Sequence, residues 1–152
     1  MDTRATERLV RGGETVAKTV RVSRDEIVAF ARMSHDANPL HTDRQAAQRA
    51  RFGEIIASGQ HTAAILMGML ATHFSRSDDG VAREMLCLNM NFAFKEPVFA
   101  DQDVLLQWRV VNVQWNNKLH GVLVHLDGNA SVAHAKPAVV ARGTILVKEC
   151  GA

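Results

Sequence analysis

The spacing of hydrophobic positions predicts a strand followed by two short helices in the first third of the chain. From Glu14 to Val22, valines alternate with polar residues, which is the pattern of a half-buried strand. Ser23, with a glutamate three residues later, has the form of a capping box and predicts a helix that runs to about Ser34. A second such box at Thr42 predicts another short helix toward Arg49.

The middle of the chain is predicted to form a longer helix, from Gln60 to Phe74, which is apolar on nearly every face. A helix of this kind is buried. After a polar loop the hydrophobic period changes to two, and four β-rich stretches follow, at residues 86–94, 104–113, 119–130 and 138–148. We expect these stretches to form an antiparallel meander. Together the elements imply an α+β domain, in which a curved antiparallel sheet of about five strands wraps around the buried central helix.

Length and composition favour a single globular domain. The 152 residues are 47% hydrophobic and 22% charged, which suits one domain with a substantial core. Residues 1–12 show no periodicity and are predicted to be a loose N-terminal arm, so the domain is expected over residues 13–150. The longest strongly apolar stretch, residues 63–71, is far too short to cross a bilayer, and the N-terminus lacks a signal peptide. We therefore expect a cytoplasmic protein with no membrane partner.

The charge pattern gives no sign of a nucleic-acid partner. The formal charge of +2 comes from 18 basic and 16 acidic residues that are scattered along the chain without a run of one sign. The two cysteines, Cys87 and Cys150, are too far apart for a disulfide framework or a metal-binding pair. A second copy of the chain is the expected partner, because one sheet and two short helices leave part of the apolar helix uncovered. We predict a homodimer or a higher homo-oligomer.

The segment from Asp36 to His41 carries the candidate chemistry. Pro39 fixes its own φ and biases Asn38 toward extended conformations, so the segment is predicted to be a stiff connector between the two short helices. From its two ends an acid and an imidazole could face one cavity, which suits general acid and base catalysis. From the residues alone, Asp36 could equally be a turn carboxylate, and His41 could simply fix the entry to the next helix.

Four side chains in and beside this segment are of types that bind metal ions. They are His35, Asp36, His41 and Asp43. Their spacing matches no closed zinc site, so no metal is predicted.

Four blocks of the sequence carry a family resemblance. In order they are Asp36-x-Asn38-Pro39-x-His41-x-Asp43, Phe52-Gly53, Ile56-Ala57-Ser58-Gly59 and Phe94-Lys95-Glu96-Pro97-Val98-Phe99. They resemble the MaoC-like dehydratases, the (R)-specific enoyl-CoA hydratases of hotdog fold, and the resemblance extends over about residues 15–148. It implies a dimer of hotdog subunits and an acyl-thioester substrate.

The resemblance also implies roles for three residues. Asp36 and His41 would bind and activate a water molecule, with His41 as the base and Asp36 as its partner in proton transfer. The backbone amide of Gly59 would hold the charge that develops on the thioester oxygen. The implied reaction interconverts a trans-2-enoyl-CoA and an (R)-3-hydroxyacyl-CoA. It needs no cofactor, because CoA is part of the substrate.

This chain departs from the common family pattern at the head of the central helix. Many members read Ala-His-Gly-Met-Leu where this chain has Ala-Ser-Gly-Gln-His, which ends at Gln60 and His61. These two polar residues would suit a short or polar acyl group, but capping the helix or lying at the subunit interface explains them equally well. Asn38 and Ser58 complete this set of possible substrate-binding or scaffold residues.

Two alternative functions follow from the same fold. Hotdog thioesterases usually place a carboxylate on the central helix or close to it, and residues 60–74 contain no Asp or Glu. A non-catalytic acyl-CoA-binding protein is the other alternative. The presence of both Asp36 and His41 speaks against it.

Overall fold

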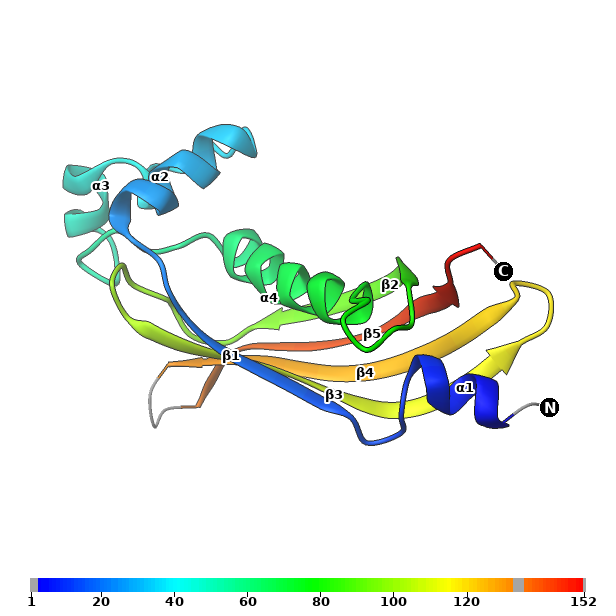
Figure 1. The fold of residues 1–152 in the computed structure, drawn as a ribbon. Coiled ribbons are helices and arrows are strands. Elements are labelled where there is room, and N and C mark those ends of the chain that lie inside the picture. The colour runs from blue at the N-terminus through cyan, green and yellow to red at the C-terminus, as the bar shows by residue number, and fades with distance from the viewer. Residues whose placement is uncertain (1–2, 133–135, 152) are drawn as a thin grey trace.

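A curved antiparallel sheet wraps around one long helix in residues 3–132 and 136–151, the part of the chain that this computed structural model describes (Figure 1). The elements in chain order are α1 (Thr3–Leu9), β1 (Thr15–Arg21), α2 (Arg24–Met33), the 3-10 helix η1 (Pro39–His41), α3 (Arg44–Arg49), α4 (Gly59–Phe74), β2 (Arg83–Phe94), β3 (Asp103–Asn116), β4 (Gly121–Val132) and β5 (Pro137–Glu149). The predicted α+β architecture with a central helix is confirmed. Helices α2 and α3 lie together beyond one end of α4, and α1 lies near the other end of the sheet.

The sheet has five strands in the order β1-β3-β4-β5-β2 within the described residues. Strands β3, β4 and β5 form a meander, but β2 pairs with β5 instead of β3, so the prediction of one meander through all four was wrong at β2. The loop after β2 explains the difference. In this loop Lys95 donates its N–H to Ala138 on β5, and Asp101 donates to Val22 at the end of β1. The chain therefore crosses from one edge of the sheet to the opposite side before β3 begins.

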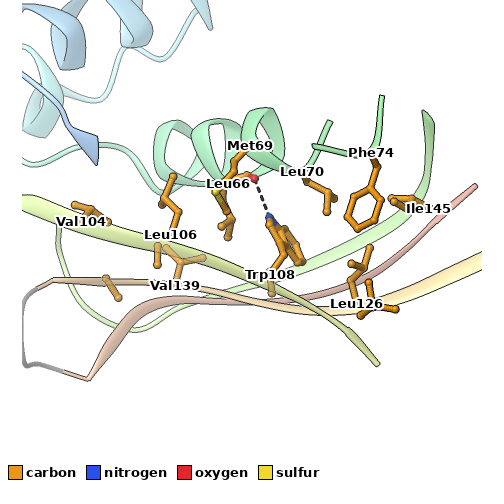
Figure 2. Close-up of a cluster of buried hydrophobic side chains, with 14 of the residues drawn as sticks. Leu66, Met69, Leu70, Phe74, Val104, Leu106, Trp108, Leu126, Val139 and Ile145 are labelled. Atoms are coloured by element: carbon orange, nitrogen blue, oxygen red, sulfur yellow. Dashed lines mark hydrogen bonds between the residues drawn. The ribbon is translucent and has the colours of Figure 1, made fainter. Parts of the chain in front are cut away.

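Helix α4 packs its apolar residues onto the concave face of the sheet, around Trp108 on β3 (Figure 2). The buried indole N–H of Trp108 donates to the carbonyl of Leu66 at 2.9 Å. Gly128 on β4 lies beneath the indole, since a Cβ there would come within 2.4 Å of the ring. Leu66, Leu70 and Phe74 are fully buried, and each such side chain stabilises the fold by about 1.5–3 kcal/mol.

One face of α4 is not covered by the described residues of its own chain. Gln60, Ala64, Gly68 and Thr72 recur at intervals of four residues along this face, and all are exposed. The single chain therefore buries about half of the helix, instead of the whole of it.

The N-terminal residues are not the loose arm that the sequence predicted. Residues 3–9 form α1, and Leu9 and Val10 at its end are buried in the main core. Gly13 then donates its N–H to the carbonyl of Val110 on β3. The prediction was wrong for residues 3–12 because two apolar residues after a charged run show no period. Residues 1 and 2 lie outside the described part of the chain.

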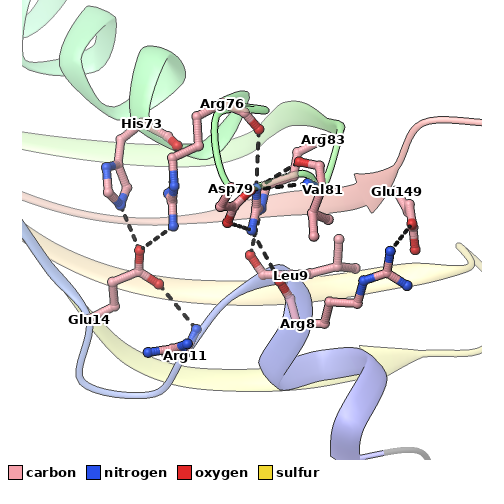
Figure 3. A network of polar contacts seen from close by, with 10 residues as sticks. All are labelled: Arg8, Leu9, Arg11, Glu14, His73, Arg76, Asp79, Val81, Arg83 and Glu149. Carbon is pink, nitrogen blue, oxygen red and sulfur yellow. Dashed lines mark hydrogen bonds and ion pairs between the residues drawn. The ribbon is translucent and has the colours of Figure 1, made fainter.

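A buried arginine joins α1 to the loop that follows α4 (Figure 3). The side chain of Arg83 is only 2% exposed. Its guanidinium donates to both carboxylate oxygens of Asp79, at 2.6 and 2.7 Å, and to the carbonyls of Leu9 and Val81. The bonds from Arg83 hold the pKa of Asp79 well below its usual range. Arg83 thus satisfies its own donors and ties three segments together.

Glu14 makes a second polar contact at this end of α4. Its carboxylate lies 2.7 Å from His73 Nε2 and accepts a hydrogen bond from Arg76 at 2.9 Å. Burial opposes ionisation of Glu14, but the bond from His73 and the bond from the Arg11 backbone outweigh it and lower the pKa. The strand β1 is thereby fixed to the last turn of α4.

Candidate active site

Helix α2 is capped by hydrogen bonds at both of its ends, and Asp36 takes part in the C-terminal cap. The predicted capping box is present, with Ser23 Oγ accepting from the Glu26 N–H and the Glu26 carboxylate accepting from the Ser23 N–H. At the other end the N–H of Asp36 donates to Ala31 O at 2.8 Å. This is a Schellman closure, in which His35 takes the left-handed conformation with φ of 58°. The chain therefore leaves the helix at Asp36 in a defined direction.

The connector after Asp36 is a short 3-10 helix. Asn38 caps it, because its Oδ1 accepts from the Leu40 N–H at 3.1 Å. Thr42, which the sequence predicted to cap the next helix, instead ends this turn by donating to the Pro39 carbonyl. Asp43 caps α3, since its carboxylate accepts the backbone N–H groups of Gln45 and Ala46. The prediction of the cap was wrong by one residue because the 3-10 turn already uses Thr42.

His41 is held in place by the strand-like segment before α4. Its side chain is 7% exposed, and its Nδ1 lies 2.7 Å from the carbonyl oxygen of Ile56. A carbonyl only accepts hydrogen bonds, so Nδ1 carries the proton, and Nε2 is the acceptor of the ring. In return, the Ile56 N–H donates to the Leu40 carbonyl at 3.3 Å. The imidazole therefore presents an acceptor nitrogen in a fixed orientation.

The structure brings Asp36 and His41 together. Asp36 Oδ2 lies 3.7 Å from His41 Nε2, and Asn38 Nδ2 lies 3.4 Å from the same nitrogen. Asp36 Oδ1 accepts the Asn38 N–H at 3.0 Å, and Oδ2 accepts from Gln60 Nε2 at 3.0 Å. The bond from the Asn38 backbone lowers the pKa of Asp36, and the bond from Gln60 and the electrostatic effect of His41 act in the same direction, although burial opposes this.

This spacing suits a single water molecule. A distance of 3.7 Å is too long for a direct hydrogen bond, but both atoms can contact one small molecule between them. With an acceptor nitrogen at Nε2 and an ionised carboxylate beside it, the pair can hold a water and take a proton from it.

Gly59 lies at the start of α4 rather than before it. The N-cap is Ser58, whose Oγ accepts from the His61 N–H at 3.2 Å. The N–H of Gly59 has no hydrogen-bond partner among the described residues, as is usual in the first turn of a helix. The ring of Phe94 packs against Gly59 and leaves no room for a side chain there. This backbone donor is therefore free to bind an anionic oxygen.

His61 is buried beside the site without contacting Asp36 or His41. Its ring stacks on Phe30 with a centroid distance of 4.3 Å, and its Nδ1 has no partner within residues 3–132 and 136–151. Burial lowers the pKa of His61, although the Glu26 carboxylate opposes this. His61 and Thr62 are the polar side chains of an otherwise apolar cavity of about 10 Å³.

Sequence reasoning missed the contact made by Gln60. The sequence suggested that Gln60 binds the substrate, caps the helix or lies at an interface, but in the structure its side-chain amide donates a hydrogen bond to Asp36. The signal was present as a polar residue at the head of an apolar helix. Its partner is 24 residues away, which no local pattern reveals.

Neither a metal cluster nor a membrane-spanning helix is found in the described part of the chain. No three His, Cys, Asp or Glu side chains gather there closely enough to hold a metal ion. No helix of these residues has the length and apolar character needed to cross a membrane.

Comparison with known families gives one match over most of the chain. The profile of the MaoC like domain matches residues 10–141. Among curated relatives, a mitochondrial 3-hydroxyacyl-[acyl-carrier-protein] dehydratase of Arabidopsis thaliana is 25% identical over 139 residues, which cover 84% of this chain and 79% of that protein. The (R)-specific enoyl-CoA hydratase of Aeromonas caviae is 29% identical over 98 residues, covering 64% of this chain and 69% of the relative.

A tomato relative is matched over a smaller part of its length. The mitochondrial 3-hydroxyacyl-[acyl-carrier-protein] dehydratase FERN of Solanum lycopersicum is 23% identical over 110 residues, which are 72% of this chain. This chain spans 62% of the length of that protein.

Solved structures share the fold. The R-hydratase PhaJ1 of Pseudomonas aeruginosa superposes with a TM-score of 0.79 at 21% identity, over 95% of this chain and 86% of the other. The (R)-hydratase of A. caviae gives a TM-score of 0.76 at 23% identity, over 90% and 96% of the two chains. The hotdog fold that the sequence resemblance implied is confirmed.

Proposed function

Because this chain belongs to the MaoC-like domain family, we propose that it is a hydro-lyase that interconverts a trans-2-enoyl-CoA and an (R)-3-hydroxyacyl-CoA. One observation carries the proposal. The acceptor nitrogen Nε2 of His41 lies 3.7 Å from the Asp36 carboxylate, while Nδ1 is bonded to the Ile56 carbonyl. A base in a fixed tautomer and an ionised carboxylate are the groups that activation of water requires.

Hydration involves two proton transfers, one from water to His41 and one from His41 to C2 of the substrate. The water oxygen bonds to C3 of the enoyl thioester, and His41 Nε2 takes one water proton. The electron pair of the C2–C3 double bond moves toward C2 and the thioester oxygen, which becomes an enolate. The enolate recovers a proton at C2 from the imidazolium, with Asp36 as the partner in this transfer. One water molecule is added, and the enzyme returns to its starting state.

Gly59 supplies the donor for the enolate oxygen. Its unpaired N–H lies at the N-terminus of a 16-residue helix, where the partial positive charge of the helix is greatest. A backbone donor of this kind is worth about two to three powers of ten in rate. The lack of a side chain lets the thioester approach closely.

The proposed acyl group is short or polar. Gln60 and His61 place polar side chains at the head of the otherwise apolar helix α4. A long fatty chain would need an extended apolar pocket.

A homodimer is the proposed assembly, and CoA enters as part of the substrate without a further cofactor. The uncovered face of α4 needs a partner, and the edge strand β2 exposes Leu86, Leu88 and Phe94. An edge strand with unpaired backbone and exposed apolar side chains suits pairing with a second copy.

The test is turnover of defined thioesters. Purified protein is incubated with crotonyl-CoA and with enoyl-CoAs that carry polar acyl groups, while the absorbance of the conjugated thioester is followed. We expect loss of this absorbance and an (R)-3-hydroxyacyl product by chiral chromatography. The same acyl groups are also supplied on acyl-carrier protein, and the turnover with the two carriers is compared to find which one the protein uses.

Asp36→Asn is the matched variant, and it is expected to lose at least about a hundredfold in turnover. An absence of turnover with both carriers would contradict the hydro-lyase proposal. Tight binding of acyl-CoA without turnover, unchanged in His41→Ala, would indicate a non-catalytic binding protein.

A further inference from the structure

We infer that Gln60 is a positioning residue, whose side-chain amide fixes the Asp36 carboxylate in the orientation that faces His41. This inference rests on the proposed function, because it assigns a role within the same site. It assigns Gln60 no contact with the substrate.

The two oxygens of Asp36 are held by different parts of the chain. Oδ1 accepts the N–H of Asn38, which is only two residues away and belongs to the same turn. Oδ2 accepts from Gln60 on α4, at 3.0 Å, and is the oxygen that lies 3.7 Å from His41 Nε2. The Asn38 bond therefore stays within the connector, whereas the Gln60 bond is the one hydrogen bond, among the described residues, that joins the carboxylate directly to α4.

Gln60 also links the carboxylate to the expected thioester site. It directly follows Gly59, so one turn of α4 carries both the free N–H and the amide that holds Asp36. The positions of the water and the thioester carbonyl oxygen relative to each other must be correct to within about 1 Å for fast addition. The Gln60 bond connects these two positions through a rigid helix.

The hydrogen bond also affects ionisation of the carboxylate. Three elements surround Asp36. Helix α2 provides the Ala31 carbonyl that accepts the Asp36 N–H, η1 provides the titratable His41, and α4 provides Gln60. Among the described residues His41 is the charged or titratable group that acts on Asp36, and the Gln60 amide adds to its effect by lowering the pKa.

Packing within the single chain does not explain the residue. Gln60 is exposed there, so its side chain fills no part of that core. The family pattern noted above has methionine at this position, so methionine also suits a face that a second copy covers. Replacing it with methionine therefore removes the donor and preserves the length of the side chain.

The experiment compares Gln60→Met, Gln60→Lys and a control, Gln48→Met, which changes an exposed glutamine on α3. In Gln60→Met we expect kcat to fall about tenfold with little change in KM, because a charge-assisted hydrogen bond is lost but substrate contacts remain. Gln60→Lys keeps an N–H donor and should retain most of kcat. Gln48→Met should match the wild type. Equal kcat values in Gln60→Met and the wild type, or equal losses in the Met and Lys variants, would overturn the inference.

A second readout does not depend on turnover. The Asp36 carboxyl resonance is identified in ¹³C-labelled protein by its loss in Asp36→Asn, and is then titrated in each variant. The midpoint should move to higher pH in Gln60→Met and should not rise in Gln60→Lys. An unchanged midpoint in Gln60→Met would overturn the inference even for a protein that turns over no enoyl thioester. Inactivity of the wild type with a shifted midpoint would instead contradict the proposed function alone.

Discussion

Phe94 packs directly against Gly59: a Cβ added to Gly59 would come within 2.7 Å of the ring carbon Cδ1 of Phe94. Phe94 is the last residue of β2, and Gly59 is the first residue of α4. The contact therefore fixes the N-terminus of the central helix against the edge of the sheet. It also places an aromatic ring, 55% exposed, next to the free N–H of Gly59.

Gly59→Ala is expected to lower kcat/KM about tenfold and to change the free energy of unfolding by less than about 1 kcal/mol. The added methyl group must displace the exposed ring or shift the helix start by a few tenths of an ångström, and such shifts are costly at a reacting centre. Kinetics on crotonyl-CoA and urea unfolding measure the two effects. Gly59→Ala should cost less activity when it is added to Phe94→Ala than when it is added to the wild type, because the ring that the methyl group meets is then absent. Simple additivity of the two losses would contradict steric conflict as the cause.

His41→Asn should separate catalysis from anchoring at this position. Asparagine keeps a donor that can reach the Ile56 carbonyl, but it has no counterpart of Nε2. We expect a fall in kcat of about two to four powers of ten, with smaller loss of stability than in His41→Ala, where the Ile56 carbonyl loses its partner. A rate in His41→Asn within tenfold of the wild type would exclude Nε2 as the base.

Arg83→Ala is expected to destabilise the protein by about 3 kcal/mol, measured as the free energy of unfolding in urea. The variant removes the donors to Asp79 and leaves carbonyls of buried segments without partners. Arg142→Ala is the control, since its side chain is 82% exposed and bonds only to Asp127 among the described residues. The control should change stability by less than about 0.5 kcal/mol. Similar values for the two variants would show that burial of Arg83 contributes little.

His61→Leu should reduce the loss of stability that occurs in mild acid. Burial lowers the pKa of His61 below its ordinary value of 6.5, so the unfolded chain binds a proton before the folded protein does. The wild type therefore loses stability as the pH falls below 6.5, and the leucine variant lacks this contribution. Unfolding free energies near pH 7.5 and near pH 5.5 test this difference, and the other histidines cancel because both proteins contain them. An equal pH dependence in both proteins would contradict the neutral, buried state of His61.

Local signals in the sequence predicted the elements that depend on neighbouring residues. The capping box of Ser23 and Glu26 has both of its hydrogen bonds, and the helix predicted from Gln60 to Phe74 begins one residue earlier, at Gly59. These features require only contacts within one turn, so their residue types are sufficient to specify them.

Features that depend on distant partners were mistaken or missed. Helix α1 packs through Leu9 and Val10, and β2 pairs with β5, although neither contact follows from local periodicity. Arg83 binds a carbonyl 74 residues away, and its sequence neighbours give no sign of this.

The candidate site lies between these two cases. The stiff connector allowed Asp36 and His41 to face one cavity, and the family spacing implied that they act on one water. The structure places Asp36 Oδ2 3.7 Å from His41 Nε2. The same spacing says nothing of Gln60, because the family pattern has methionine there. Only the observed hydrogen bond shows what the departure from that pattern does.

The two ends of helix α4 have different roles. Its first turn carries Gly59 and Gln60 beside the site, and its last turn and following loop carry His73, Arg76 and Asp79, which hold β1 and α1 in place. Tolerance to mutation should differ between the two ends, because changes at the first turn alter turnover while the scaffold persists. Variant libraries built at the first turn should therefore be sorted by turnover, and libraries built at the distal anchor by thermal stability.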